Sequence, residues 1–153
     1  DEELEQLFAM SGKFKGVCKV ARSARWEKWR FAQASGQNYQ WVVARKGDFI
    51  QAACVIGKSL VNEAMTLSEL LGESPTALQA VLSVAIEKAF AARAPFVTAL
   101  TNVPEYLVAL RRVGFVRVRQ VPLIVRGLTG ELLDANIHAH ASWRIFGADL
   151  DTM

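Results

Sequence analysis

The sequence is poor in the residues that organise secreted, metal-binding or membrane-spanning proteins. It holds two cysteines and two histidines among 153 residues. No apolar run approaches the roughly 18 residues that suggest a membrane span, and the acidic start at Asp1 is the opposite of a signal peptide's basic start. Cys18 and Cys54 lie far apart without a CxxC or Cys/His spacing, which indicates free, buried thiols in a reducing compartment. We therefore expect a soluble, cytoplasmic protein.

Several catalytic signatures are also absent. The sequence has no G-x-S-x-G nucleophile elbow, no G-x-G-x-x-G and no Walker motif, so serine hydrolases and enzymes built on those nucleotide motifs have no positive support. His138 and His140 would point to the same side of an extended segment. No third ligand is obvious near them in the sequence, so we expect no metal site.

The residues that are present favour one folded domain. Apolar residues make up 52% and charged residues 22% of the chain, which excludes an intrinsically disordered protein. A chain of this length buries about 68–70% of the surface that it exposes when unfolded. We expect a single domain over 1–153, either whole or the C-terminal part of a longer protein.

The net charge of +3 conceals two basic runs, at 13–30 and 111–126. Arginine-rich runs attract phosphate, on nucleic acid or on a nucleotide cofactor, and a solvated basic face is the other interpretation. Trp26 and Trp29 lie in the first run and could stack on single-stranded nucleic acid. Aromatic residues three apart are more typical of the buried stripe of a helix, so nucleic acid is the less favoured partner.

The spacing of apolar residues predicts an α+β order of elements. Helices are expected at 1–10, after an N-cap at Ser23, at 75–93 and from about 104 to 113. Ser74 is the predicted N-cap of the third helix, with Pro75 at its first position. Asn102 to Glu105 has the form of a capping box, and Gly114 closes the last helix. The predicted strands cover 14–22, 39–45, 49–56, 64–71, 96–101, 115–125 and 143–146.

Two connections set the predicted topology. Lys46-Gly47-Asp48 is a strong hairpin signal between the strands at 39–45 and 49–56. The strand at 64–71, the helix at 75–93 and the strand at 96–101 would form a parallel strand, helix, strand unit with a right-handed crossover. The expected sheet is therefore an antiparallel meander that continues into one parallel pair.

This order of elements resembles the GNAT superfamily of N-acyltransferases. The helix at 74–93 stands where the family has its acyl-CoA motif, and 101–115 looks like the family's helix that runs into Gly114-Phe115. Residues 22–31 and the ending at 143–151 are similar to a branch of bacterial GNAT-like proteins found with surface-polysaccharide genes. The resemblance implies a GNAT-like α+β fold, a mixed and mostly antiparallel sheet flanked by helices.

The resemblance also implies a function, acyl-CoA-dependent transfer of an acyl group to an amine. The acceptor would be a small-molecule amine or an amino sugar, and the coenzyme would be acetyl-CoA or another acyl-CoA. A helix N-terminus beside the ends of parallel strands offers N–H groups to a pyrophosphate. The residues implied in binding the coenzyme are Leu70, Leu71, Ser74, Thr76, Ala77 and Asn102, of which Asn102 is equally explained as a helix cap.

The resemblance implies two catalytic residues. Glu69 matches a family glutamate that serves as general base for the amine, although a solvent-facing strand residue explains it equally well. Leu110 stands at the place of the family's proton-donating tyrosine, and Tyr106, one helical turn earlier, is the substitute candidate. An ordinary helix contact with its hydroxyl at the surface is the other interpretation of Tyr106.

The predicted phosphate-binding turn departs from the family pattern. Glu73 stands where an Arg or Gln belongs, and Thr76 and Leu78 stand where two glycines belong. A carboxylate repels a pyrophosphate, and the side chain of Leu78 takes up space near the backbone. The alternative function is therefore a catalytically inert GNAT-like module that binds a carbohydrate intermediate, a partner protein or a neighbouring domain.

Overall fold

The structure is a computed structural model that describes residues 2–11, 18–19, 23–33, 38–59, 63–72, 74–119, 139 and 143–147. The helices are α1 (Glu2–Ser11), α2 (Ala24–Lys28) with the π-helical turn η1 (Trp29–Gln33), α3 (Pro75–Ala91) and α4 (Pro104–Arg112). The strands are β1 (Cys18–Lys19), β2 (Gln40–Lys46), β3 (Phe49–Lys58), β4 (Met65–Gly72), β5 (Val97–Ala99) and β6 (Trp143–Arg144).

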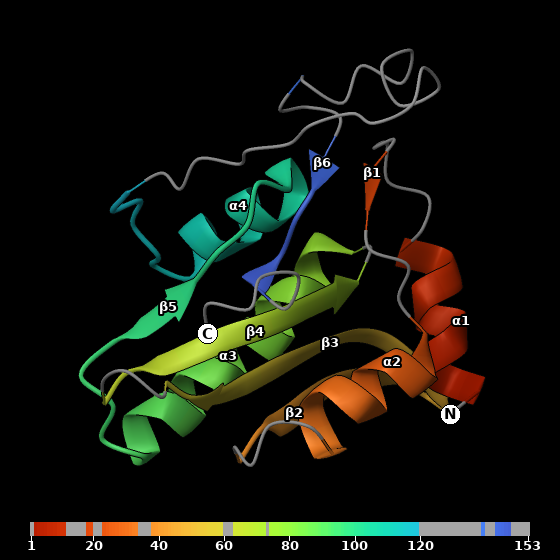
Figure 1. The fold of residues 1–153 in the computed structure, drawn as a ribbon, viewed down its shortest axis with the longest axis horizontal. Coiled ribbons are helices and arrows are strands. Elements are labelled where there is room, and N and C mark those ends of the chain that lie inside the picture. Colours follow the sequence, from red (N-terminus) through yellow and green to blue (C-terminus); the bar gives the residue numbers. More distant parts are fainter. Residues whose placement is uncertain are drawn as a thin grey trace.

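The main sheet confirms the predicted α+β class. Its four strands have the order β2-β3-β4-β5, antiparallel in the first two pairs and parallel between β4 and β5. Helix α3 packs on one face of this sheet, and α1 packs on the other (Figure 1). The sheet is therefore mixed, mostly antiparallel and flanked by helices.

Two local signals in the sequence are confirmed. Gly47 has a φ of +60° in the turn between β2 and β3, a left-handed conformation that glycine adopts at little cost. Ser74 caps α3, and its Oγ accepts a hydrogen bond from the Ala77 N–H at 3.5 Å. Helix α3 ends at Ala91 rather than at the predicted 93, because Arg93 takes a φ of 56°.

The entry into α4 differs from its prediction. The N-cap of α4 is Val103, and no side chain caps the helix there. The carboxamide of Asn102 instead donates to the Trp143 carbonyl and accepts from the Ile145 N–H, both at 2.8 Å. The predicted capping box is therefore wrong, because the residues around β6 bind the side chain that would have formed it.

One predicted strand is absent where the structure describes it. Of the predicted strand at 14–22, the described residues are 18–19, and both lie in β1. Residues 115–119 form no strand, and 120–125 lie outside the described residues. Val116 and Val118 are 80% and 86% exposed. The alternating apolar side chains that suggested a strand here are therefore not packed against the core.

The main core lies between the sheet and α3, and Cys54 is at its centre. The Cys54 side chain is fully buried, and its Sγ donates to the Val81 carbonyl at 3.6 Å. This confirms the predicted free, buried thiol; the side chain of Cys18 lies outside the described residues. Burial disfavours the thiolate and raises the pKa of Cys54 to about 12.

We expect the buried thiol to make the free energy of unfolding fall with rising pH. In the unfolded chain the thiol has a pKa of about 8.5, so between that pH and about 12 the folded chain binds one proton more. The thiol contributes its full stabilisation of the folded state below about pH 8.5. Above that pH the free energy of unfolding falls by up to about 1.4 kcal/mol per pH unit. Urea unfolding from pH 7 to pH 10 should show this slope in the parent chain and a flatter one in Cys54→Ala. Equal slopes would contradict it.

Candidate functional site

Strand β4 has an edge that β5 covers only in part. The parallel register joins Met65 to Val97 and ends where Leu67 meets Ala99, whereas β4 continues to Gly72. Figure 1 shows β4 extending well past β5. Within the described ranges no strand pairs with residues 68–72 on this side, which we call the open edge of β4. Unpaired N–H and C=O groups on a strand can bind an extended chain.

A β-bulge lies at the start of the open edge. Val55 pairs with Glu69 and Ile56 with Leu67, so Ser68 is the extra residue of β4. Ser68 is fully buried, and its Oγ has no hydrogen-bond partner among the described residues. Bulges bend a strand and redirect its side chains, and they are frequent beside active sites.

Glu69 follows the bulge and is buried. Its side chain is 1% exposed, so the interpretation of Glu69 as a solvent-facing residue is wrong. Its Oε1 accepts a hydrogen bond from the Leu70 N–H at 3.0 Å. The carboxylate therefore bends back on β4 and binds a backbone donor within residues 68–72. A carboxylate is costly to bury, and its predicted role as a base stays a prediction.

Leu70 and Leu71 present only their backbone to a ligand. Both side chains are buried, Leu70 in the core beneath α3 and Leu71 with Ile50 and Ala53 on the opposite face. Strand β4 ends at Gly72, and α3 begins at Pro75 after its N-cap Ser74. The strand and the helix to which the resemblance assigned the coenzyme are therefore consecutive elements of the chain.

The first turn of α3 has few free donors. Pro75 has no N–H, the Ala77 N–H binds Ser74 Oγ, and the Leu78 N–H binds the Ser74 carbonyl. In the described part of the chain this leaves the N–H of the N-cap Ser74 and the N–H of Thr76, whose side chain is exposed. A pyrophosphate would meet two unsatisfied backbone donors here instead of the four that a helix N-terminus usually offers.

Leu78 packs tightly against the end of β4. It is 1% exposed, and a Cβ built on Gly72 would lie 3.1 Å from Leu78 Cδ2 and 2.8 Å from the Cβ of Ala52. Gly72 also has a φ of +149°. The junction between β4 and α3 thus depends on a glycine, a requirement that the family's glycine positions did not indicate.

Tyr106 is buried in the core. It is 5% exposed, its ring meets Phe146 edge to face at 5.8 Å, and the Arg144 guanidinium lies 5.9 Å from its centroid. It belongs to the hydrophobic cluster beneath α3, whereas Glu69 lies opposite Val55, which packs with Phe31 in another cluster. The structure therefore places the two predicted catalytic residues in different clusters.

Asn102 has a structural task. Its carboxamide binds the backbone on either side of Arg144, at the Trp143 carbonyl and the Ile145 N–H, and the neighbouring Thr101 hydroxyl donates to the Ile145 carbonyl at 2.9 Å. These bonds join the segment after β5 to β6. Contact with a coenzyme through this side chain would have to replace them.

Sequence analysis missed Ser68 and Gly72. Nothing in a run of strand residues marks Ser68 as the bulge, because the register of β3 decides which residue is extra. Gly72 carried a usable signal, since it comes just before the cap of a helix, where a glycine permits a sharp change of direction.

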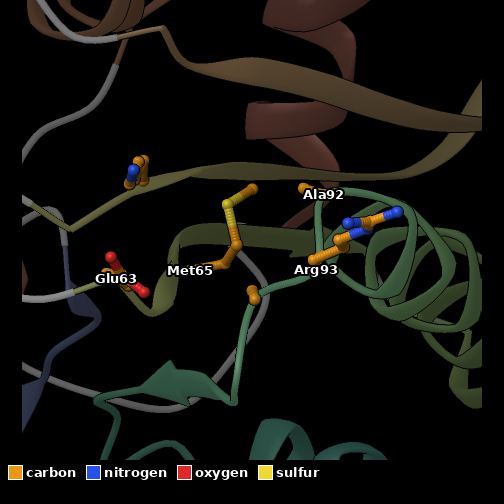
Figure 2. A pocket seen from close by; sticks show the side chains of 6 residues that line it. Glu63, Met65, Ala92 and Arg93 are labelled. Carbon is orange, nitrogen blue, oxygen red and sulfur yellow. The ribbon is translucent and has the colours of Figure 1, made fainter.

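A cleft lies at the other end of β4. Its volume is about 250 Å³, and it is lined by Lys58, Glu63, Met65, Ala92, Arg93 and Ala94. Figure 2 shows Met65 between Glu63 on one side and Ala92 and Arg93 on the other. Because this cleft adjoins the start of β4 and the C-terminal end of α3, it contains none of the predicted site residues.

Other site classes find little support where the structure describes the chain. No group of three metal-ligating side chains occurs among the described residues, and His138 and His140 lie outside them. Among the described helices, none is long and apolar enough to cross a membrane. The open edge of β4 and the first turn of α3 are thus the candidate site.

Comparison with known proteins adds the fold alone. No protein-family model matches the chain, and no curated protein matches it. Among solved structures it is similar to TTHA1254 from Thermus thermophilus, with a TM-score of 0.57 to a point mutant and 0.54 to the wild type. Each likeness has 24% sequence identity and covers 84% of this chain and 91% of the other.

Proposed function

We propose that the chain is a GNAT-like domain that transfers an acyl group from acyl-CoA to a small amine or an amino sugar. The observation that carries this proposal is the open edge of β4, which holds a buried carboxylate, Glu69, and leads directly into the capped N-terminus of α3. An extended ligand chain can bind such an edge as an additional strand, with its phosphate end near Thr76.

Bound acyl-CoA would supply an activated acyl carbon. Backbone groups within residues 70–72, other than the Leu70 N–H that binds Glu69, would bind the amide groups of the coenzyme's extended arm. Glu69 would take a proton from the amine, directly or through water, as the N–C bond forms, and the C–S bond would break to release the coenzyme A thiolate, which takes up a proton. Glu69 is supported by its place on the open edge. Tyr106, which the resemblance implies as the proton donor, lies in a different cluster from Glu69 and is supported by the resemblance alone.

A second candidate is a catalytically inert module with the same fold. The first turn of α3 favours it, because Pro75 lacks an N–H, the Ala77 N–H is already bound to Ser74, and Leu78 fills the space beside Gly72. Such a module would bind a carbohydrate intermediate, a partner protein or another domain without needing coenzyme A.

Titration calorimetry with acetyl-CoA and with free coenzyme A separates the two candidates. The N-acyltransferase should bind both saturably, and Thr76→Glu should raise the dissociation constant about tenfold, because a carboxylate in the first turn repels the pyrophosphate. The same substitution suits the helix itself, since acidic residues stabilise a helix N-terminus.

Ser83→Glu is the matched control, because Ser83 is exposed in the middle of the same helix. It should leave the dissociation constant unchanged. Binding that ignores Thr76→Glu would place the coenzyme away from α3. No heat of binding at millimolar coenzyme would sink the acyltransferase proposal and leave the inert module.

A further inference from the structure

Helix α2 and the π-helical turn η1 expose a tryptophan that was expected to be buried. Trp26 is half-buried, as a stripe on the inner side of a helix would be, but Trp29 is 53% exposed. The interpretation of the two tryptophans as one buried stripe is therefore wrong for Trp29. Its ring is available to stack on a ligand.

The π-helical turn explains why Trp29 faces outward. In a π-helix the hydrogen bonds join residues five apart, and Trp26 meets Phe31, five residues later, edge to face at 6.3 Å. Phe31 is 4% exposed, so Phe31 rather than Trp29 continues the buried stripe. Turns of this kind are rare and frequently lie at functional sites.

Strand β2 adds apolar side chains on the same side of the molecule. Trp41 meets Phe31 edge to face at 6.0 Å, so it lies on the face of the sheet that η1 covers, beside α2 in Figure 1. Trp41 is 36% exposed, and Val43, two residues later on the same face, is 42% exposed. We call Arg25, Lys28, Trp29 and Trp41 together the aromatic–basic surface.

The exposed charges of this surface are basic. Arg25 and Lys28 are exposed, whereas Glu27, the acid between them, is fully buried. In the described part of the chain neither cation forms an ion pair. Arg25 and Trp29 are four residues apart and are therefore neighbours on the helix surface. Two cations thus flank the exposed ring of Trp29, without a carboxylate to neutralise them.

We propose that the aromatic–basic surface binds single-stranded nucleic acid, with a base stacked on Trp29 and phosphates bound by Arg25 and Lys28. A single strand carries both regularly spaced anions and flat rings, and its unpaired bases are free to stack on aromatic side chains. Cations beside an aromatic ring suit both parts of such a ligand. Binding here would not involve α3, which packs on the opposite face of the sheet.

The burial of the neighbouring side chains favours this partner over a lipid surface. An anionic bilayer also attracts tryptophan and basic residues, but it binds by burying apolar side chains that insert into it. Trp41 and Val43 are each more than half covered by their own chain, which leaves Trp29 as the ring that protrudes. A single exposed ring between cations can stack on a base but offers little area to insert.

Fluorescence anisotropy of a short labelled oligo(dT) with the full chain tests the proposal. The parent chain should bind it saturably at low salt. Trp29→Leu should raise the dissociation constant about 5- to 150-fold, the usual loss when one base–aromatic stack is removed. Trp29→Phe keeps a ring face and should bind more tightly than Trp29→Leu. Phe90→Leu is the matched control, because Phe90 is 84% exposed on α3; it should leave the dissociation constant unchanged.

The salt dependence of binding gives a second readout that does not need the aromatic variants. For single strands, log Kd rises with log salt by about 0.7 for each phosphate that the protein binds. Lys28→Ala should therefore lower this slope by about 0.7. Arg93→Ala removes an exposed cation just after α3 and should leave the slope unchanged.

Three results would overturn the proposal. The first is the absence of saturable binding to oligo(dT) at low salt. The second is binding that keeps the parent's dissociation constant in Trp29→Leu and the parent's salt slope in Lys28→Ala, since the strand would then lie elsewhere on the chain. The third is binding to phosphatidylserine vesicles, retained in Trp29→Leu, by a chain that does not bind oligo(dT); this would assign the surface to a bilayer.

Discussion

Replacing Glu69 with Gln is expected to lower kcat/KM for acyl transfer by about 10²–10⁴-fold, the usual contribution of a positioned general base. The amide keeps the size of the side chain, and its oxygen can still accept from the Leu70 N–H, so the fold should be retained. The measurement is release of free thiol from acetyl-CoA in the presence of glucosamine and a panel of small amines. Circular dichroism and a thermal melt would establish that the variant is folded.

Glu27→Gln is the matched control. Glu27 is also fully buried, but it lies in α2 and not on β4. The two variants remove a carboxyl group from a buried position, and only Glu69→Gln removes it from the open edge. An equal loss of activity in both would assign the effect to the packing around α2. Full activity in Glu69→Gln would show that Glu69 is not the base.

The sequence predicted those features whose causes are local. Ser74 and Pro75 begin α3 because a side-chain oxygen caps one backbone donor and a proline needs none. Gly47 turns the β2–β3 hairpin because it adopts a positive φ. Each signal is contained in two or three neighbouring residues, so it could be found without knowing the rest of the fold.

The sequence failed where a distant partner decides the outcome. Asn102 has the residue type and spacing of a helix cap, yet it binds Trp143 and Ile145, more than forty residues away along the chain. Tertiary hydrogen bonds to partly buried backbone groups can outweigh a local cap, because a buried polar group left without a hydrogen bond costs about 1–3 kcal/mol. Both predictions for Asn102, the helix cap and the coenzyme contact, failed to consider these hydrogen bonds to Trp143 and Ile145.

The candidate site was predictable in its position along the chain but not in its details. Leu70 and Leu71 lie in β4 and Ser74 caps α3, as the predicted strand and helix had them; their contact with a coenzyme stays a prediction. The bulge at Ser68 and the buried carboxylate of Glu69 depend on the register between β3 and β4, which no spacing within β4 reveals. Burial of Glu69 distinguishes it from the ordinary exposed strand residue that its local sequence allowed.

Gly72→Ala is expected to lower the free energy of unfolding by about 2–6 kcal/mol. A φ of +149°, which L-residues rarely adopt, costs about 1–3 kcal/mol, and the new methyl group would lie 2.8 Å from the Cβ of Ala52. Overpacking of this kind adds about 1–3 kcal/mol. Ala52 is fully buried in β3, so the strand pair has little room to separate. Urea unfolding measures the change.

Gly47→Ala separates the two causes of that loss. Gly47 also has a positive φ, +60°, but nothing lies within 4 Å of the added Cβ, so only the backbone term of about 1–2 kcal/mol applies. Equal losses of unfolding free energy in both variants would mean that the β4–α3 junction accommodates the added methyl group without a packing penalty. A larger loss in Gly72→Ala, together with weaker binding of coenzyme A, would identify Gly72 as the residue that sets the start of α3 against the open edge of β4.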